Sequence, residues 1–357
     1  MSHHVTRRRT MALAAGTALA GCLGETSDAP PAASATETSV RGPPPADRGL
    51  PLAYDRDRLR EAVVSGGVAV DGIPSIDDPS FVDASAAALP ADGDVVFGVV
   101  RGGTPTAYPR QILVHHEIVN DRLDGVPVSV TYCPLTGTTM GFERGATTFG
   151  VSGDLVNSNL VMYDRGTDSR WPQMLATAIA GPLSGQSLRE FDLHWTTWGR
   201  WRARYPDTRV LSRDTGYVRN YGVDPYGSYG PKRGYYAQEY TVFQPLTDDG
   251  RLPTKAVVVG VRTPQGAAAV SRSRLRRRGV ADLSIADDRV LIVADDALDA
   301  AYGYRVPGET AVTADSDGVL VDGTRHAPAA LPFERRPAVE AMWFAWSGFY
   351  PGTALHA

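Results

Sequence analysis

The chain has 357 residues, a formal net charge of −4 and an ordinary 43% of hydrophobic residues. A mildly acidic chain lacks the electrostatic footprint of a nucleic-acid-binding protein, so we expect no nucleic-acid partner. Lys232 and Lys255 are the only lysines, so arginine supplies almost all of the basic charge, and aspartate outnumbers glutamate. This bias is typical of salt-adapted microbes such as haloarchaea and says nothing about chemistry.

The first 21 residues have the three parts of an export signal. Arg7, Arg8 and Arg9 precede an apolar segment over residues 11–20, and small residues follow it. The apolar segment is too short to span a bilayer, which takes about 20 residues. The pair Arg8-Arg9 resembles a twin-arginine signal, so we expect export by the twin-arginine machinery.

Leu19-Ala20-Gly21-Cys22 resembles a lipobox, in which the cysteine receives a lipid and becomes the new N-terminus. We therefore predict a lipoprotein signal over residues 1–21 and a lipid on Cys22 that anchors the chain to the outer face of the cytoplasmic membrane. Residues 22–48 are rich in Ala, Pro, Ser and Thr without apolar periodicity, which is typical of a disordered tether. The alternative is an ordinary cleaved signal with an incidental cysteine.

Residues 49–357 are expected to form a single mainly β domain, a β-rich α+β fold with a few short helices. Apolar runs or alternating patterns predict strands at 95–100, 111–119, 128–133, 147–151, 159–163, 257–261 and 290–293. Helices are predicted at 58–65, 78–88 and 196–205. The basic run 272–278 is predicted to be a solvated helix end before Gly279. The Tyr/Gly-rich segment 217–240 is expected to be an ordered loop, and the aromatic segment 342–350 to be buried.

The second and third predicted strands are expected to pair as a hairpin that carries the most reactive side chains. His116 is the polar exception on a strand face otherwise formed by Ile112, Val114 and Ile118. Cys133 lies at the end of the partner strand, just before a proline. We therefore expect His116 and Cys133 to approach each other and to line the functional site.

Several short motifs occur in a fixed order: 108–121, Thr131-Tyr-Cys-Pro-Leu135, 149–153, 162–165, 169–173, 181–185, Trp195-Thr-Thr-Trp198, 206–211 and 343–351. In this order they resemble the domain of unknown function 3179 family over roughly residues 50 to 355. The resemblance implies no activity, because the family is defined by sequence. Many relatives have Cys-Pro-Leu-Cys where this chain has Cys133-Pro-Leu-Thr136, so we do not expect paired-thiol exchange.

A copper site is the first functional hypothesis, because imidazole, thiolate and thioether ligands together suit copper. The candidate metal ligands are His116, Cys133, His115 and Met162, with Met140, Glu117 and Asp121 in the same group. The alternative is that His116 is a hydrogen-bonded core histidine and Cys133 a small buried hydrophobic residue.

A thiol-dependent enzyme is the second hypothesis. Cys133 would attack a substrate, His116 or His115 would act as the base, and Asp121 or Asn120 would orient that base. No local cysteine-hydrolase motif supports this assignment.

A non-catalytic module for a small ligand or carbohydrate is the third hypothesis. Asp164, Trp171 and Gln173, with Tyr163 and the 217–240 segment, could line a cleft that offers aromatic faces and polar groups. The alternative is that these aromatics pack irregular loops. Motifs for nucleotide binding, serine hydrolysis and c-type haem are absent from the sequence.

Overall fold

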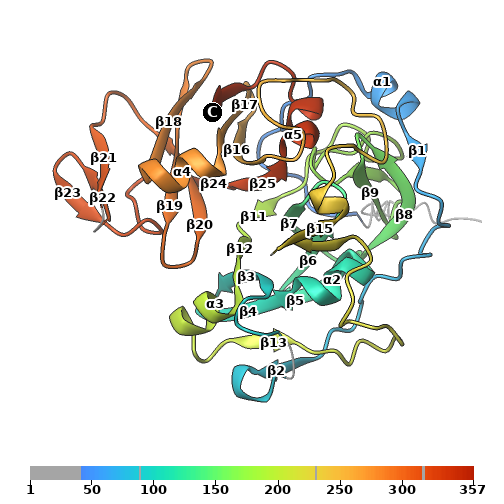
Figure 1. Cartoon of the computed structure of the whole chain (residues 1–357). Helices are drawn as coiled ribbons and strands as arrows, with labels where there is room; N and C mark the ends of the chain where they lie inside the picture. The colour runs from blue at the N-terminus through green and yellow to red at the C-terminus, as the bar shows by residue number, and fades with distance from the viewer. Residues whose placement is uncertain (1–41, 88–89, 230, 316–317) are drawn as a thin grey trace, which may run out of the picture. The chain divides into compact units, whose positions relative to one another are not determined.

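One arrangement of strands and helices occurs twice and makes up most of the fold (Figure 1). The computed structural model describes residues 42–87, 90–229, 231–315 and 318–357, which belong to one compact unit. The first copy consists of β3 (Val95–Arg101), β4 (Thr104–Pro109), α2 (Arg110–His116), β5 (Ile118–Leu123), β6 (Val126–Cys133), β7 (Thr138–Glu143), β11 (Glu190–Phe191), β12 (His194–Thr197), α3 (Trp198–Arg204) and β13 (Arg209–Leu211). The second consists, in the same order, of β16 (Val257–Thr263), β17 (Gly266–Ser271), α4 (Arg272–Arg278), β18 (Val280–Ile285), β19 (Asp288–Asp295), β20 (Ala300–Val306), β24 (Glu334–Arg336), β25 (Val339–Met342), α5 (Trp343–Phe349) and β26 (Ala354–His356).

The two copies share their sheet topology. The first copy has one sheet in the order β12-β3-β4-β13 and another in the order β11-β7-β6-β5. The second copy has β25-β16-β17-β26 and β18-β19-β20-β24, which are the same orders with the matching strands. In both copies the last strand of the first sheet joins in parallel and the other strand pairs are antiparallel. We therefore describe the fold as an internal repeat.

A tryptophan on a short helix packs onto a strand glycine in each copy. A Cβ atom on Gly98 would lie 2.3 Å from the ring of Trp201, and one on Gly260 would lie 2.1 Å from the ring of Trp346. Only glycine leaves room for the indole at these positions. In both copies the indole N–H donates to the hydroxyl of a threonine seven residues further on.

The remaining elements flank the first copy, connect the two copies, or, in the case of β21–β23, form a sheet inserted between β20 and β24 of the second copy. They are α1 (Arg56–Glu61), β1 (Val64–Ser65), β2 (Phe81–Asp83), η1 (Ala84–Ala86), β8 (Phe149–Val156), β9 (Asn159–Asp164), β10 (Arg170–Pro172), β14 (Gly227–Tyr229), β15 (Lys232–Gly234), η2 (Tyr235–Ala237), β21 (Val312–Asp315), β22 (Gly318–Val321) and β23 (Thr324–His326). Strand β2 extends the β12-β3-β4-β13 sheet, and β1, β8, β9 and β10 form a sheet of their own. The largest apolar core joins β8 and β9 to β6, β7, β16, β25 and α5.

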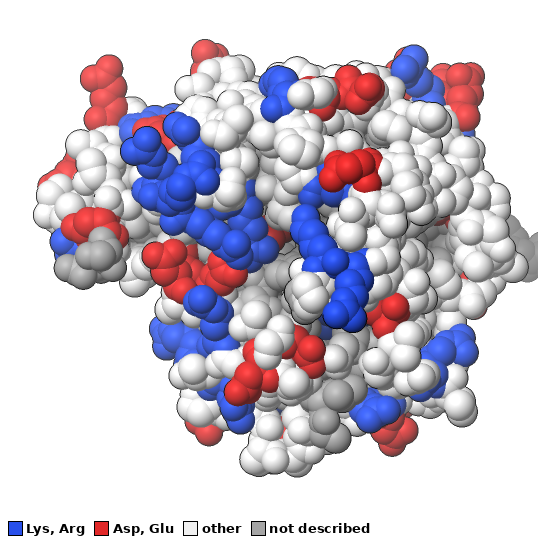
Figure 2. All heavy atoms as spheres, in the orientation of Figure 1, with Lys and Arg blue, Asp and Glu red and all other residues white. Residues whose placement is uncertain are grey.

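The β-rich character and most of the predicted elements are confirmed. The predicted strands near 95, 128, 159, 257 and 290 are β3, β6, β9, β16 and β19, and the predicted helix at 196–205 is α3 preceded by β12. The closing aromatic segment forms α5, whose residues are all buried. Helix α4 ends at Gly279 as predicted, and Figure 2 shows basic side chains gathered over this helix at the solvated surface.

The predicted strand at 111–119 is wrong. Residues 110–116 form α2, and the strand β5 begins only at Ile118. An apolar run this short fits both the alternation of a strand and the periodicity of a helix, and the buried Ile112, Leu113 and His116 follow the helical periodicity. The hairpin exists, but its strands are β5 and β6 and its turn is Asp124-Gly125, where both residues have positive φ.

Two further boundaries differ from the predictions. The predicted helix at 78–88 is instead β2, paired with β13, followed by the single turn η1; residues 88 and 89 lie outside the described residues. Residues 42–48 of the predicted tether lie against the domain, since Pro45 forms a bridge with Leu188 and the N–H of Ala46 donates to the carbonyl of Ser187.

The predicted signal, Cys22 and residues 23–41 lie outside the described residues. In the part of the chain that is described, no helix is long and apolar enough to cross a membrane.

Candidate functional site

Glu117 occupies a strained backbone position between α2 and β5. Its φ is +58°, and its N–H donates to the carbonyl of Leu113 at 2.7 Å to close the helix. The matching residue of the second copy is Gly279, with φ +73° and the same bond to Leu275 at 2.8 Å. A glycine adopts this conformation freely, whereas another residue there costs of the order of 1–3 kcal/mol. The first copy thus keeps a glutamate where the fold favours glycine.

The Glu117 side chain lies at the wall of a cavity of about 240 Å³, which we call the Glu117 cavity. The cavity is otherwise mainly apolar, and its lining includes Val68, Ile73, Leu135, Val151, Leu155, Leu160, Tyr226, Val242 and Phe243. Glu117 is only 7% exposed, and its carboxyl group has no hydrogen-bond partner among the described residues. Burial raises the pKa of Glu117 from 4.5 to about 8, so the carboxyl is mostly protonated at neutral pH.

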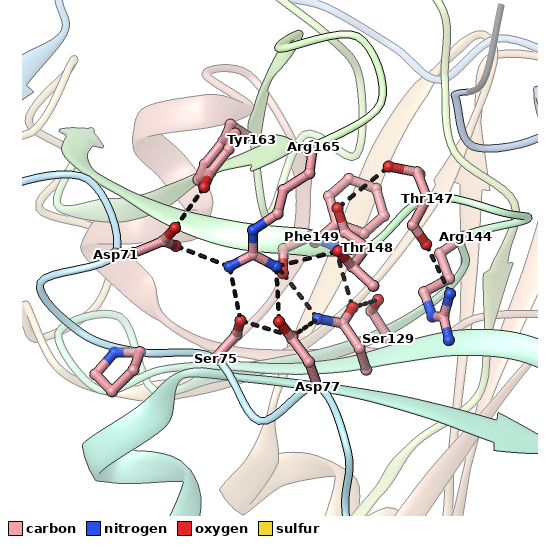
Figure 3. Close-up of polar contacts among 12 residues, drawn as sticks. Asp71, Ser75, Asp77, Ser129, Arg144, Thr147, Thr148, Phe149, Tyr163 and Arg165 are labelled. Carbon is pink, nitrogen blue, oxygen red and sulfur yellow. Dashed lines mark hydrogen bonds and ion pairs between the residues drawn. The ribbon is translucent and has the colours of Figure 1, made fainter. Parts of the chain in front are cut away.

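The segment that follows β1 covers one side of this cavity and is held by Arg165 (Figure 3). The Arg165 guanidinium forms ion pairs with Asp71 and Asp77, each at 3.0 Å, and donates to the hydroxyl of Ser75 at 3.1 Å. The Tyr163 hydroxyl donates to Asp71 at 2.6 Å. We call these five residues the Arg165 clamp.

Asn120 on β5 ties the clamp to the strand that follows Glu117. Its amide donates to Asp77 at 2.6 Å and to the carbonyl of Phe149 at 2.8 Å, and its oxygen accepts from the hydroxyl of Ser129 at 2.6 Å. All the polar groups of Asn120 are therefore used in fixing β5, β8 and the covering segment together. The orientation of a catalytic base by Asn120 stays a prediction.

Cys133 is buried on β6, and among the described residues its sulfur is hydrogen-bonded to neither His115 nor His116. Its Sγ contacts the carbonyl of Ser158 at 3.7 Å, and the residue is 1% exposed. Burial, followed by the nearby negative charge of Glu117, raises the pKa of the thiol to about 11. A protonated, inaccessible thiol is a poor nucleophile.

His116 is a core histidine with both ring nitrogens satisfied. Its Nδ1–H donates to the carbonyl of Pro74 at 2.8 Å, and its Nε2 accepts from the Tyr221 hydroxyl at 2.7 Å. Burial lowers the pKa of the imidazole, which favours this neutral form. His115 contacts the carbonyl of Val223 at 2.9 Å. Both histidines thus attach α2 to surrounding loops, and neither is hydrogen-bonded to Cys133.

The other predicted ligands also have protein partners. Asp121 accepts from Tyr108 at 2.6 Å and from Arg209 at 3.1 Å, and Met162 is a fully buried core residue. Within the described ranges, no group of three or more His, Cys, Asp or Glu side chains is placed to hold a metal ion. The copper site therefore stays a prediction that no observed cluster of ligands supports.

Asp164, Trp171 and Gln173 are fully buried. The Trp171 indole donates to Asp164 at 3.0 Å, and the amide of Gln173 donates to the hydroxyl of Thr131 at 2.8 Å and accepts from Asn159 at 2.9 Å. Their polar groups therefore hold the core together, and ligand binding by these three residues stays a prediction.

The 217–240 segment is ordered by an ion pair with α2. Arg110 pairs with Asp224, and its guanidinium lies 5.1 Å from the ring centre of Tyr229. Tyr229 in turn stacks on Tyr236 with ring centres 3.9 Å apart. The segment includes the short hairpin β14–β15, although residue 230 lies outside the described residues. Its Tyr226 contributes to the Glu117 cavity.

The comparisons with known proteins identify a family and no function. A family model described as Protein of unknown function (DUF3179) matches residues 70–353. Neither the curated proteins nor the solved structures gave a match.

Proposed function

We propose a function for this chain from its own site, because the chain belongs to the family described as Protein of unknown function (DUF3179) and that description names no activity. The protein binds a small, mostly apolar molecule in the Glu117 cavity, and the protonated Glu117 donates a hydrogen bond to an acceptor on that molecule. One observation carries the proposal: a buried, unpaired glutamate occupies a strained position at which the second copy has glycine.

The energetics favour a functional reason for this glutamate. Burial in a mainly apolar cavity disfavours the charged form of the Glu117 carboxyl, and the positive φ adds a penalty of roughly 1–3 kcal/mol. Glycine would remove both costs, as Gly279 does in the second copy. Side chains kept at such a cost in an apolar cavity are candidates for ligand binding.

The cavity volume limits the ligand. A dry cavity of about 150 Å³ is known to hold benzene, so about 240 Å³ accommodates a single ring with one small polar substituent. A charged carboxylate ligand is disfavoured, because it would be desolvated beside Glu117. A carbonyl compound such as acetophenone has the required acceptor and no charge.

The thiol-enzyme hypothesis has less support than binding. The pKa of Cys133 is raised, its sulfur is buried, and His116 and Asp121 are engaged with other partners. The ionised form of Glu117 would further disfavour the thiolate.

Acetophenone and toluene are a matched pair of probes for the proposed site. We expect acetophenone to bind more tightly than toluene at pH 6, and this preference to disappear at pH 9.5, where Glu117 is ionised and can no longer donate. Glu117→Gln retains an N–H donor, so it should keep the preference at both pH values, whereas Glu117→Gly should lose it. Ligand-observed NMR titrations measure these affinities.

Glu61→Gln on the exposed face of α1 is the control variant and should behave as the native protein does. Equal binding of the two probes at pH 6, or a preference that survives in Glu117→Gly, would contradict the proposal.

We also propose that the protein acts outside the cytoplasmic membrane as a lipoprotein anchored through Cys22. The support is the order of basic residues, apolar segment and lipobox in residues 1–22. The pair Arg8-Arg9 favours export by the twin-arginine machinery, with the domain already folded.

Cys22→Ser tests the anchor. We expect the variant to leave the membrane fraction or to accumulate as an uncleaved precursor, because the lipid acceptor is gone. Fractionation and immunoblotting measure its distribution, and Arg8→Lys with Arg9→Lys tests the export route in the same assay. Unchanged membrane association of Cys22→Ser would rule out the lipid anchor.

A further inference from the structure

A second cavity, of about 500 Å³, lies between the first copy and strand β20 of the second and has mainly polar walls. Its lining includes His194, whose Nδ1 is buried without a hydrogen-bond partner in the described part of the chain, and Tyr205 and Tyr302, whose rings frame the same space. The rings of His194 and Tyr302 are 4.8 Å apart, centre to centre. One buried ring nitrogen without a partner and two tyrosines that hydrogen-bond to no described side chain thus surround one space.

The second copy shows that the fold does not require an unpaired hydroxyl at this place. Tyr350 follows α5 as Tyr205 follows α3. The Tyr350 hydroxyl donates to the carbonyl of Met174 at 3.1 Å and accepts from Arg262 at 3.3 Å. At the matching position of the first copy, Tyr205 is half-buried, lines the cavity, and donates to no described residue.

The charged groups around the cavity compensate one another. Arg101 pairs with Glu143, and Arg335 pairs with Asp192. Burial lowers the pKa of His194, so its imidazole is neutral at pH 7. The cavity therefore offers no uncompensated charge to an ionic ligand, but it offers donors, acceptors and aromatic rings.

We propose that this second cavity binds an uncharged carbohydrate. Each sugar hydroxyl is both a donor and an acceptor, which suits an imidazole with one N–H and one free nitrogen and two tyrosine hydroxyls. The apolar face of a pyranose ring can pack on the aromatic rings beside them. The volume exceeds that of the Glu117 cavity and fits one to two sugar units.

Hydroxyl deletions test the site without removing its rings. Cellobiose, maltose and diacetylchitobiose serve as uncharged probes, with glucuronate and glucosamine as charged ones, in saturation-transfer NMR and calorimetry up to 10 mM. We expect at least one uncharged probe to bind and Tyr205→Phe and Tyr302→Phe each to weaken it about three- to ten-fold, the value of one hydrogen bond. Tyr240→Phe, at an exposed tyrosine outside the cavity, should have no effect.

If none of the uncharged probes binds at 10 mM, the proposal is overturned. Tighter binding of a charged probe would also overturn it, as would binding of an uncharged probe that both phenylalanine variants leave unchanged while their melting temperatures equal that of the native protein.

Discussion

Replacing Glu117 by glutamine is expected to stabilise the protein at pH 9 by up to about 5 kcal/mol and to have little effect at pH 5. The pKa of Glu117 is about 8 in the folded protein and about 4.5 in the unfolded chain. Between these values the folded state holds a proton that the unfolded state has released, so stability falls as the pH rises. Above pH 8 the whole free-energy cost of ionising the buried Glu117 carboxyl is present. Glutamine does not ionise and avoids it.

Urea denaturation from pH 4 to 9.5 measures this effect, as the difference in the free energy of unfolding between the native protein and Glu117→Gln. The difference should grow through the window from 4.5 to 8 and then level off. Glu61→Gln should show no such growth, because Glu61 is exposed. If the curves of the native protein and Glu117→Gln run parallel across that window, Glu117 is not protonated in the folded state.

The strands could be predicted where local pattern and long-range pairing agree. In β6, the alternation of the sequence puts Val128, Val130 and Tyr132 on one face of the strand and Cys133 on the other, and the two faces lie in separate cores. The internal repeat was missed, because the copies share geometry more than sequence. Its clearest signal is the similarity of Val95-Val-Phe-Gly98-Val to Val257-Val-Val-Gly260-Val, together with a pair of tryptophans three residues apart after β12 and after β25.

The role of Glu117 could not be predicted from the sequence. The strand predicted over residues 111–119 places Glu117 on the face opposite Ile118, and the sequence suggests Glu117 only as a member of the candidate metal-ligand group. Helix α2 instead ends at His116, one residue before Glu117, and the positive φ of Glu117 turns its carboxyl into the Glu117 cavity. Residues separated by 90 or more positions, such as Asp71 and Arg165, then cover and fix this region. Local periodicity carries no information about such contacts.

Removal of the guanidinium in Arg165→Met is expected to cost about 1–3 kcal/mol of stability and to loosen the segment over residues 66–77. An isolated surface ion pair is worth less than about 1 kcal/mol. Arg165, however, joins two aspartates, the Ser75 hydroxyl and the carbonyl of Phe149, and is 29% exposed. Hydrogen exchange should therefore rise in residues 66–77 and stay unchanged in β16 and β19.

Arg202→Met is the matched control for the clamp. Arg202 pairs with Asp92, and the two side chains are 49% and 71% exposed, so its loss should cost less than about 0.5 kcal/mol. Because the clamped segment covers the Glu117 cavity, Arg165→Met should also weaken acetophenone binding several-fold, whereas Arg202→Met should not. Unchanged exchange in residues 66–77 of Arg165→Met would mean that the covering segment is held by its other contacts, among them the bond from His116 to Pro74.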